Sequence, residues 1–298
     1  MSEWPTLLVL AACYTLWLLS LILHGSLGPV SIVVAIVVAI YCVTLFSSLQ
    51  HEMLHGHPTR NPTFNELLVF PALNLFIPYR RFRHLHLRHH RDKLLTDPYE
   101  DPETWYLSST QWQQSNRWMK RLLAINNTLA GRMIIGPALS LTAFYRQDYK
   151  LIRQGRRHIA LAWFYHAVGV ITVFFILHQV QIPIWYYVVA IAYPAMSLLM
   201  LRTFIEHRAA QHSDHQTAVV ESGWLMSLLF LNNNLHAVHH RYPGESWFRL
   251  PERWNKERLS VLATNGHYYF SDGYLGICKR WLFRRKEPIA HPFHSRSK

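Results

Sequence analysis

Two long stretches without lysine or arginine constrain this chain more than any other feature of its sequence. Residues 1–50 and 158–201 contain neither residue, and all 30 basic side chains lie in the segments 51–157 and 202–298. Each stretch is long enough to cross a bilayer twice, since one crossing takes about 20 apolar residues. The sequence therefore predicts four membrane spans, at residues 4–23, 29–49, 158–178 and 183–203.

The turns inside each pair of spans, HGSLGP and QVQI, also lack lysine and arginine. Because basic segments are retained in the cytoplasm, these turns are expected outside, with residues 51–157, residues 206–298 and both termini cytoplasmic. We expect a single all-α domain over residues 1–298: four transmembrane helices in two hairpins with a cytoplasmic His-rich helical cap, in a bacterial inner membrane.

Topology also accounts for the formal net charge of +13, which by itself would suit a nucleic-acid-binding protein. We therefore expect membrane and lipid partners and no nucleic acid. The three cysteines form no C-x-x-C pair, so no disulfide framework, zinc knuckle or iron–sulfur site is expected. Residues 64–78 and 223–231 are apolar but too short to span, and residues 121–145 are expected to form one amphipathic helix on the membrane surface.

Histidines recur in three clusters with helical spacing. His51 and His55 are four residues apart, and two other clusters each place histidines at i, i+3 and i+4: His86, His89, His90 and His236, His239, His240. On a helix, each cluster occupies one face. Neutral imidazole is the commonest nitrogen ligand for transition metals. A solvated His-rich tract gives no reason for such matched faces, so the pattern predicts a metal site.

His207 directly follows the last span and brings the candidate ligands to nine. Nine imidazoles exceed the four ligands of a zinc ion and suit two metal ions with four or five ligands each. Carboxylates are expected behind such ligands, accepting the other ring N–H. The candidates are Glu52, Asp92, Asp97, Asp101 and Glu206. Glu206 could instead pair with Arg202 on an exposed helix surface.

The segments HEMLH, HLRHH and HAVHH, in this order around four spans, resemble the three histidine boxes of the membrane fatty acid desaturase superfamily. The segments EHR at 206–208, DPYEDPE at 97–103 and HHRYPGESWFRLP at 239–251 also resemble that family. The resemblance runs from Gln50 to Pro251. It implies a non-haem centre of two iron ions (Fe²⁺/Fe³⁺) with dioxygen as co-substrate, and it places Asn232 near the metals.

The resemblance implies an oxidoreductase that desaturates a fatty acyl chain. Hydroxylation, ketone formation on a carotenoid and oxidative decarboxylation of a fatty acid to a terminal alkene use the same site class and stay open. No fused redox module is visible, so a separate electron donor is expected, a ferredoxin or a b-type cytochrome with its reductase. Outside this class, a His-rich metal transporter is the alternative, although its ligands would be expected within the spans.

Several polar residues near these motifs have two interpretations. Arg80, Arg81 and Arg83 could receive a substrate carboxylate or bind lipid phosphates. His57, two residues after the first box, is expected to be a loop residue.

Overall fold

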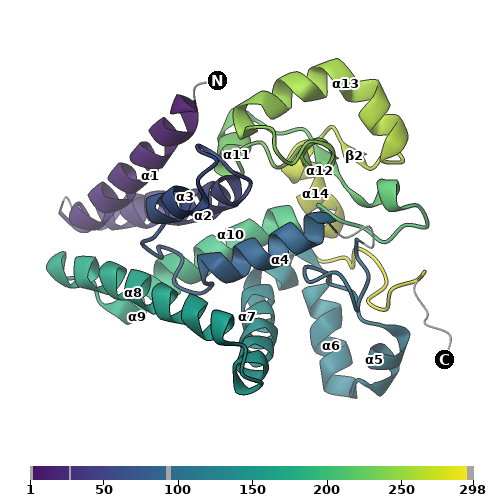
Figure 1. Ribbon diagram of the computed structural model, residues 1–298, viewed down its shortest axis with the longest axis horizontal. Helices are drawn as coiled ribbons and strands as arrows, with labels where there is room; N and C mark the ends of the chain where they lie inside the picture. Colours follow the sequence, from purple (N-terminus) through teal and green to yellow (C-terminus); the bar gives the residue numbers. More distant parts are fainter. Residues whose placement is uncertain (1–2, 27, 92–94, 294–298) are drawn as a thin grey trace. The chain divides into compact units, whose positions relative to one another are not determined.

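The computed structural model describes residues 3–26, 28–91 and 95–293, and its regular structure is mainly helical (Figure 1). The longer helices are α1 (Trp4–Ile22), α2 (Pro29–Leu54), α4 (Tyr79–Arg91), α6 (Arg117–Asn126), α7 (Leu129–Arg153), α8 (Arg157–Gln179), α10 (Tyr193–Thr203), α13 (Leu250–Thr264) and α14 (Gly273–Trp281). The short elements are α3 (Pro62–Leu68), α5 (Ser109–Gln114), α9 (Ile184–Tyr187), α11 (Trp224–Leu229), α12 (His236–Arg241), β1 (Val219–Val220) and β2 (Tyr269–Phe270).

The chain divides into two compact units, each built from separate stretches of sequence. Unit 1 contains Met1–Arg83, Ala138–Leu199 and Leu229–Leu231. Unit 2 contains His84–Pro137, Met200–Leu228 and Asn232–Lys298. That residues 1–298 form a single domain stays a prediction.

Four helices in the described part of the chain are long and apolar enough to cross a membrane, and nearly all of their residues belong to unit 1. They are Trp4–Ile22, Pro29–Leu54, Arg157–Gln179 and Ile184–Thr203, which matches the four predicted spans. Large apolar side chains on them are more than 60% exposed, among them Val30, Val33, Phe164, Ile171 and Phe175. Such surfaces suit the hydrocarbon of a membrane rather than water. The apolar side chains can contact lipid tails, while the backbone N–H and C=O groups are hydrogen-bonded within each helix.

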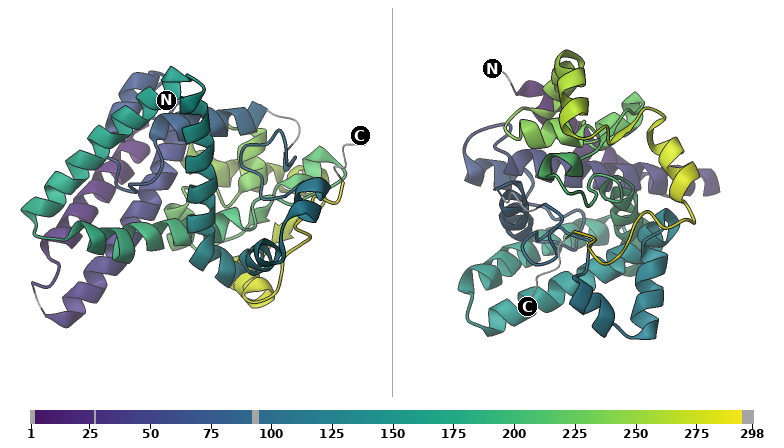
Figure 2. Two further views of the ribbon diagram at one scale, coloured as in Figure 1. Left: turned by 90° about the horizontal axis from the view of Figure 1, so that it is seen from below. Right: turned by 90° about the vertical axis from the view of Figure 1, so that its right-hand side faces the viewer.

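α1 and α2 pack against each other and lie side by side in Figures 1 and 2. Polar contacts tie α1 to more distant parts of unit 1. Trp17 Nε1 donates to the hydroxyl of Tyr187 (3.0 Å), which donates to the carbonyl of Leu73 (2.8 Å). α2 runs five residues past the predicted end of its span at residue 49. This extension carries His51 on a continuous helix beyond the apolar segment.

The expected single helix over residues 121–145 is wrong. α6 ends at Asn126 and α7 begins at Leu129, so the chain turns between them. The physical reason lies at Gly131, where a Cβ would come within 1.9 Å of the Ile125 carbonyl oxygen. The start of α7 therefore lies directly against the end of α6, which a single straight helix does not allow.

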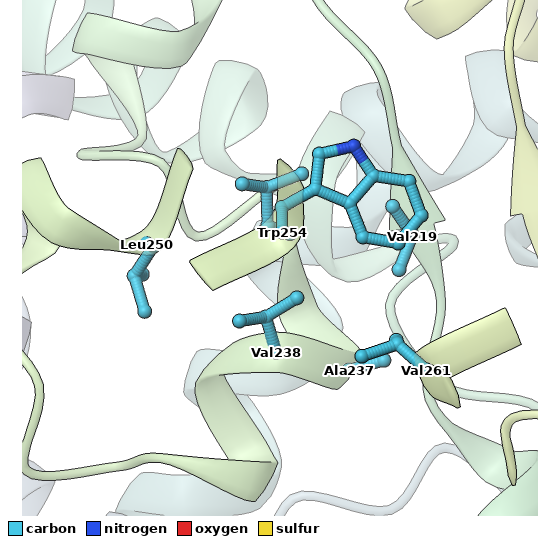
Figure 3. Close-up of a cluster of buried hydrophobic side chains, with 7 residues drawn as sticks. Val219, Ala237, Val238, Leu250, Trp254 and Val261 are labelled. Carbon is cyan, nitrogen blue, oxygen red and sulfur yellow. The ribbon is translucent and has the colours of Figure 1, made fainter. Parts of the chain in front are cut away.

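Unit 2 has a small apolar core beneath α12 (Figure 3). Ala237 and Val238 from α12 pack there with residues of β1 and α13, namely Val219, Leu250, Trp254 and Val261. β1 pairs in parallel with β2, with Val219 opposite Tyr269. Because Ala237 and Val238 face this core, the three histidines of α12 lie on the opposite side of that helix.

Candidate metal centre

Four histidines of unit 2 converge through their Nε2 atoms. The Nε2 of His207 lies 3.1 Å from that of His89 and 3.0 Å from that of His236, and His236 lies 3.0 Å from His240 by the same atoms. All four candidate ligand atoms lie within 4.8 Å of one another. The residues come from α4, from the segment after α10 and from α12, so the site joins stretches that are far apart in sequence.

Three further histidines of unit 2 form a second group. The Nε2 of His90 lies 3.0 Å from that of His86 and 3.1 Å from that of His239. On α4, His86 and His90 stand one turn apart and belong to this second group. His89 lies about 60° from His86 around the same helix and belongs to the first group. Unit 2 thus brings together the seven sequence-predicted ligands that it contains.

The two remaining predicted ligands, His51 and His55, belong to unit 1. His51 lies in the last turn of α2 and His55 follows the end of that helix, with ring centroids 4.8 Å apart. His51 is buried. Their spacing on one helix face is therefore as the sequence predicts, and their role as ligands stays a prediction.

Hydrogen bonds on the opposite ring atom fix the state of several imidazoles. Nδ1 of His86 bonds Glu103 (2.9 Å) and Nδ1 of His89 bonds Asp101 (2.8 Å), both of which are acceptors as carboxylates. Nδ1 of His236 bonds Oδ1 of Asn233 (3.0 Å). In a neutral imidazole with its proton on Nδ1, Nε2 presents a lone pair, so these lone pairs point into the two groups.

When all of these rings are neutral, protons cannot satisfy such an arrangement. Nε2 of His207 faces the lone pairs of His89 and His236 at 3.1 and 3.0 Å, and one N–H could bond only one of them. A cation at the centre of each group would satisfy all of its nitrogens at once. Two nitrogens each about 2.1 Å from a metal ion lie roughly 3.0 Å apart at a right angle and roughly 3.4 Å apart at a tetrahedral angle. The observed spacings of 3.0 and 3.1 Å are therefore short enough for these nitrogens to share one metal ion.

The ionisation of these groups also suits metal binding. Burial lowers the pKa of His207 to about 3, and His89 reinforces the effect. Burial and the neighbouring imidazoles hold the pKa values of His236 and His240 well below their usual range. Metal ligation requires neutral imidazole, so these rings are ready to bind without losing a proton.

His89 behaves differently because of its acidic neighbours. Burial by itself would lower its pKa, but Glu103 and the hydrogen-bonded Asp101 raise it to about 9. His89 must therefore release its second proton before its Nε2 can bind a metal ion, unlike His207, His236 and His240. Burial by itself would raise the pKa of Glu103, but the neighbouring imidazoles of His86 and His89 lower it below its usual range. The carboxyl groups of Asp101 and Glu103 therefore stand behind the imidazoles, where they would offset part of the charge of a bound cation.

The carboxylates named from the sequence have different surroundings. Asp101 bonds His89, whereas Asp97 accepts from the backbone of Tyr99 and Glu100 and shapes the turn. Glu52 is buried on α2 in unit 1, and Asp92 lies outside the described residues. Glu206 is buried, with its Oε2 3.1 Å from Nε of Arg202 and 3.9 Å from Nδ1 of His236.

Sequence reasoning missed two groups that contact the imidazoles. Glu103 ends the DPYEDPE turn, and its distance in sequence from His86 gave no reason to pair them. Asn233 bonds His236, whereas its neighbour Asn232 donates to the carbonyl of Trp247 (3.0 Å). The run of three asparagines before HAVHH was the available signal, but the sequence could not select which one faces the ring.

Arg80 and Arg81 form ion pairs with carboxylates of unit 1. Arg81 forms a buried bidentate ion pair with Asp148, at 2.9 and 2.7 Å, and Arg80 pairs with Glu66 at 2.6 Å. His57 lies 3.4 Å from the carboxylate of Glu3. In this structure the two arginines therefore form ion pairs within unit 1.

Apolar spanning helices and two groups of converging imidazoles define the class, a helical membrane protein with a candidate transition-metal centre. The sequence matches the fatty acid desaturase family over residues 27–273, which covers every predicted histidine ligand. The chain belongs to this family, as the histidine boxes predicted, and family membership supports the class of membrane di-iron oxidoreductases. No curated protein matches the chain.

Proposed function

We propose that this protein is an integral-membrane di-iron desaturase that removes two hydrogens from a fatty acyl chain with dioxygen as co-substrate. The observation that carries the proposal is the convergence of four Nε2 atoms within 4.8 Å, with lone pairs directed inward by Asp101 and Asn233. Such a donor set suits a transition-metal ion. A metal is required because no side chain can attack an unactivated C–H bond.

In this proposal His89, His207, His236 and His240 hold one iron ion. His86, His90 and His239 hold the other, and the sequence pattern adds His51 and His55 to the ligand set. When bound, the two ions would supply the oxidising power for C–H cleavage. Asp101 and Glu103 orient the rings of His89 and His86 and keep their protons on Nδ1. Glu52, Glu206 and Asn232 stay candidates for further contacts around the metals.

The remaining features of the proposal concern topology and partners. Both hairpin turns face outward and both termini face the cytoplasm, in a bacterial inner membrane, with a histidine-bearing cytoplasmic cap. Electrons come from a separate ferredoxin or from a b-type cytochrome with its reductase. A metal transporter is less well supported, because His89, His207, His236 and His240 all lie outside the four apolar helices.

Product analysis tests the reaction. The protein is expressed with a redox donor and fed fatty acids of several lengths, and products are identified by gas chromatography–mass spectrometry. A new double bond supports desaturation. An alcohol, a ketone or a terminal alkene would instead establish one of the alternative outcomes of the same site, and no oxidised product with a competent donor would contradict the proposal.

Metal analysis tests the centre independently of turnover. We expect two iron atoms per chain in the purified protein, and large loss of iron in His89→Ala and His239→Ala. His57→Ala is the matched control, since His57 lies outside the histidine boxes and its Nδ1 is 3.4 Å from the carboxylate of Glu3. Full iron content in both ligand variants would refute the assignment of these residues.

A further inference from the structure

A pocket in unit 2 lies directly behind the imidazole group. Its walls come from the turn after α4, the α6–α7 junction, the segment after α10 and the tail after α14. The tail is held in place because Lys286 Nζ donates to the carbonyls of Phe204 (2.8 Å) and His207 (2.6 Å). The residues that carry its polar character are Asp101, Glu103, Asn126, Arg132, Lys286 and Glu287.

Arg132 is a buried cation in this pocket, with only 5% of its surface exposed. Its guanidinium lies over the ring of Trp105 at 3.1 Å, and its Nε donates to the carbonyl of Asn126 (3.1 Å). Its Nη1 is buried and has no hydrogen-bond partner. Glu287 is the nearby carboxylate, but its ion pair is with Lys286 at 2.6 Å.

The charge of Arg132 persists at neutral pH. Burial lowers its pKa to about 9, and Glu287 opposes that effect. A protonated guanidinium without a fully compensating anion is costly to bury, because charges in protein interiors are normally paired. Arg81 shows the usual solution in this chain, since Asp148 neutralises it with a bidentate pair.

Two other pocket-lining residues also have unsatisfied polar atoms. Nδ1 of His207 has no hydrogen-bond partner, although the corresponding atoms of His89 and His236 have theirs. Oδ1 of Asn126 is buried without one as well. Rotation of that amide by 180° would present a donor instead. Arg132 and His207 therefore line the same pocket with donors that the protein leaves free.

We propose that this pocket binds a carboxylate group, which accepts a hydrogen bond from Nη1 of Arg132. Its source is either the carboxyl end of a fatty acid, in which case the inference rests on the proposed function and names the substrate as a free acid, or a small free carboxylate. A thioester-linked acyl chain lacks the negative charge that Arg132 would recognise.

The charges around the pocket favour a monoanion. Of the three carboxylates that line the pocket, Glu287 pairs with Lys286, while Asp101 and Glu103 bond the rings of His89 and His86. The guanidinium of Arg132 is therefore the cation that is left for a ligand. A phosphate dianion would meet the repulsion of these carboxylates, whereas a carboxylate adds one charge to match the guanidinium.

Calorimetric binding to the iron-loaded protein in nanodiscs tests the inference without turnover. The probes are octanoate, acetate, methyl octanoate and inorganic phosphate. We expect octanoate to bind and methyl octanoate, which lacks the charge, not to bind. Octanoate affinity should fall on the order of 10- to 100-fold in Arg132→Gln and largely persist in Arg132→Lys. Arg88→Gln is the control, because Arg88 is half-exposed and pairs with Glu100.

The outcomes separate the two sources. Octanoate binding much tighter than acetate assigns the pocket to a fatty acid, and equal affinities assign it to a small carboxylate. Undiminished affinity in Arg132→Gln, equal binding of methyl octanoate, stronger binding of phosphate, or no binding of any carboxylate would overturn the inference. Binding is measured without an electron donor and so does not depend on turnover. A protein that binds octanoate here, yet forms no product in the assay with a competent donor, refutes only the proposed reaction.

A measurement on the unaltered protein covers the case in which Arg132→Gln fails to fold. The carboxyl carbon of ¹³C-labelled octanoate is followed by NMR as the pH is lowered. Pairing with Arg132 should lower the pKa of the bound acid by about 1 to 3 units relative to the free acid. A bound acid that titrates like the free acid would refute the pairing.

Discussion

At the scale of single residues, the imidazoles differ in what holds their second ring nitrogen. His89 has the carboxylate of Asp101 at 2.8 Å, and that carboxylate also accepts from the backbone nitrogens of Thr96 (2.8 Å) and Glu103 (2.9 Å). A side chain held by three hydrogen bonds cannot easily move away from the ring. The orientation of His89 is therefore set by the turn that follows α4.

Asp101→Asn should lower iron affinity by about 10- to 100-fold, because an amide holds the His89 proton less strongly and offsets no charge. The variant should fold, since Asn keeps most of the turn hydrogen bonds. Iron content under a competing chelator measures the effect. Glu100→Gln, one residue earlier and exposed, should behave as the unaltered protein, and equal loss in both variants would contradict the role given to Asp101.

For Glu206 we predict a different effect from that of Asp101. Burial raises the pKa of Glu206, and the neighbouring Arg202 opposes this rise. Its oxygen is 3.9 Å from Nδ1 of His236, beyond hydrogen-bond distance, and 3.1 Å from Nε of Arg202. Glu206→Gln should therefore lose stability, on the order of 3 kcal/mol for a broken buried pair. Its loss of iron should be smaller than in Asp101→Asn.

The matched control for Glu206 is Glu252→Gln. Glu252 and Lys256 form an ion pair of the same i, i+4 spacing, but both side chains are 67% exposed. Exposed pairs of this kind contribute a few tenths of a kcal/mol. Melting temperatures of the two variants separate the cases, and similar small shifts would show that Glu206 lies in a solvated environment.

At the scale of elements, the α6–α7 junction positions Arg132. Thr128 bonds the carbonyl of Ile125 through its backbone nitrogen (3.0 Å) and its hydroxyl (2.8 Å), and Gly131 packs against the same carbonyl. Only glycine fits there, because any Cβ would meet backbone atoms of Ile125. The junction thus fixes both the turn and the start of the helix that carries Arg132.

Gly131→Ala should destabilise the protein by about 1 to 3 kcal/mol, the usual cost of overpacking a well-packed site. The melting temperature of the purified protein is the measurement. Gly223→Ala is the control, since nothing lies within 4 Å of a Cβ at that position. If the two alanine variants melt alike, the contact with Ile125 is not restrictive.

At the scale of the whole molecule, the distribution of basic residues predicts topology. A reporter fused at His24 or Gln179 should be read outside the cytoplasm, and one fused after Lys298 should be read inside. The reason is the absence of lysine and arginine from both hairpin turns. A cytoplasmic signal at Gln179 would contradict the topology.

The sequence by itself determined the four apolar helices, the family and the grouping of histidines on helix faces. These are local properties, because span length and 3.6-residue spacing depend only on neighbouring positions. The sequence placed His86, His89 and His90 on one helix face, whereas the structure assigned His86 and His90 to one group and His89 to the other.

Only the tertiary structure decided which side chains stand behind the imidazoles. Glu103 and Asn233 reach His86 and His236 because of the path of two irregular segments, which no periodicity encodes. The same holds for Arg132, whose sequence neighbours suggest an ordinary amphipathic helix. Its burial over Trp105 depends on contacts between distant segments, and such contacts arise only when the chain has folded.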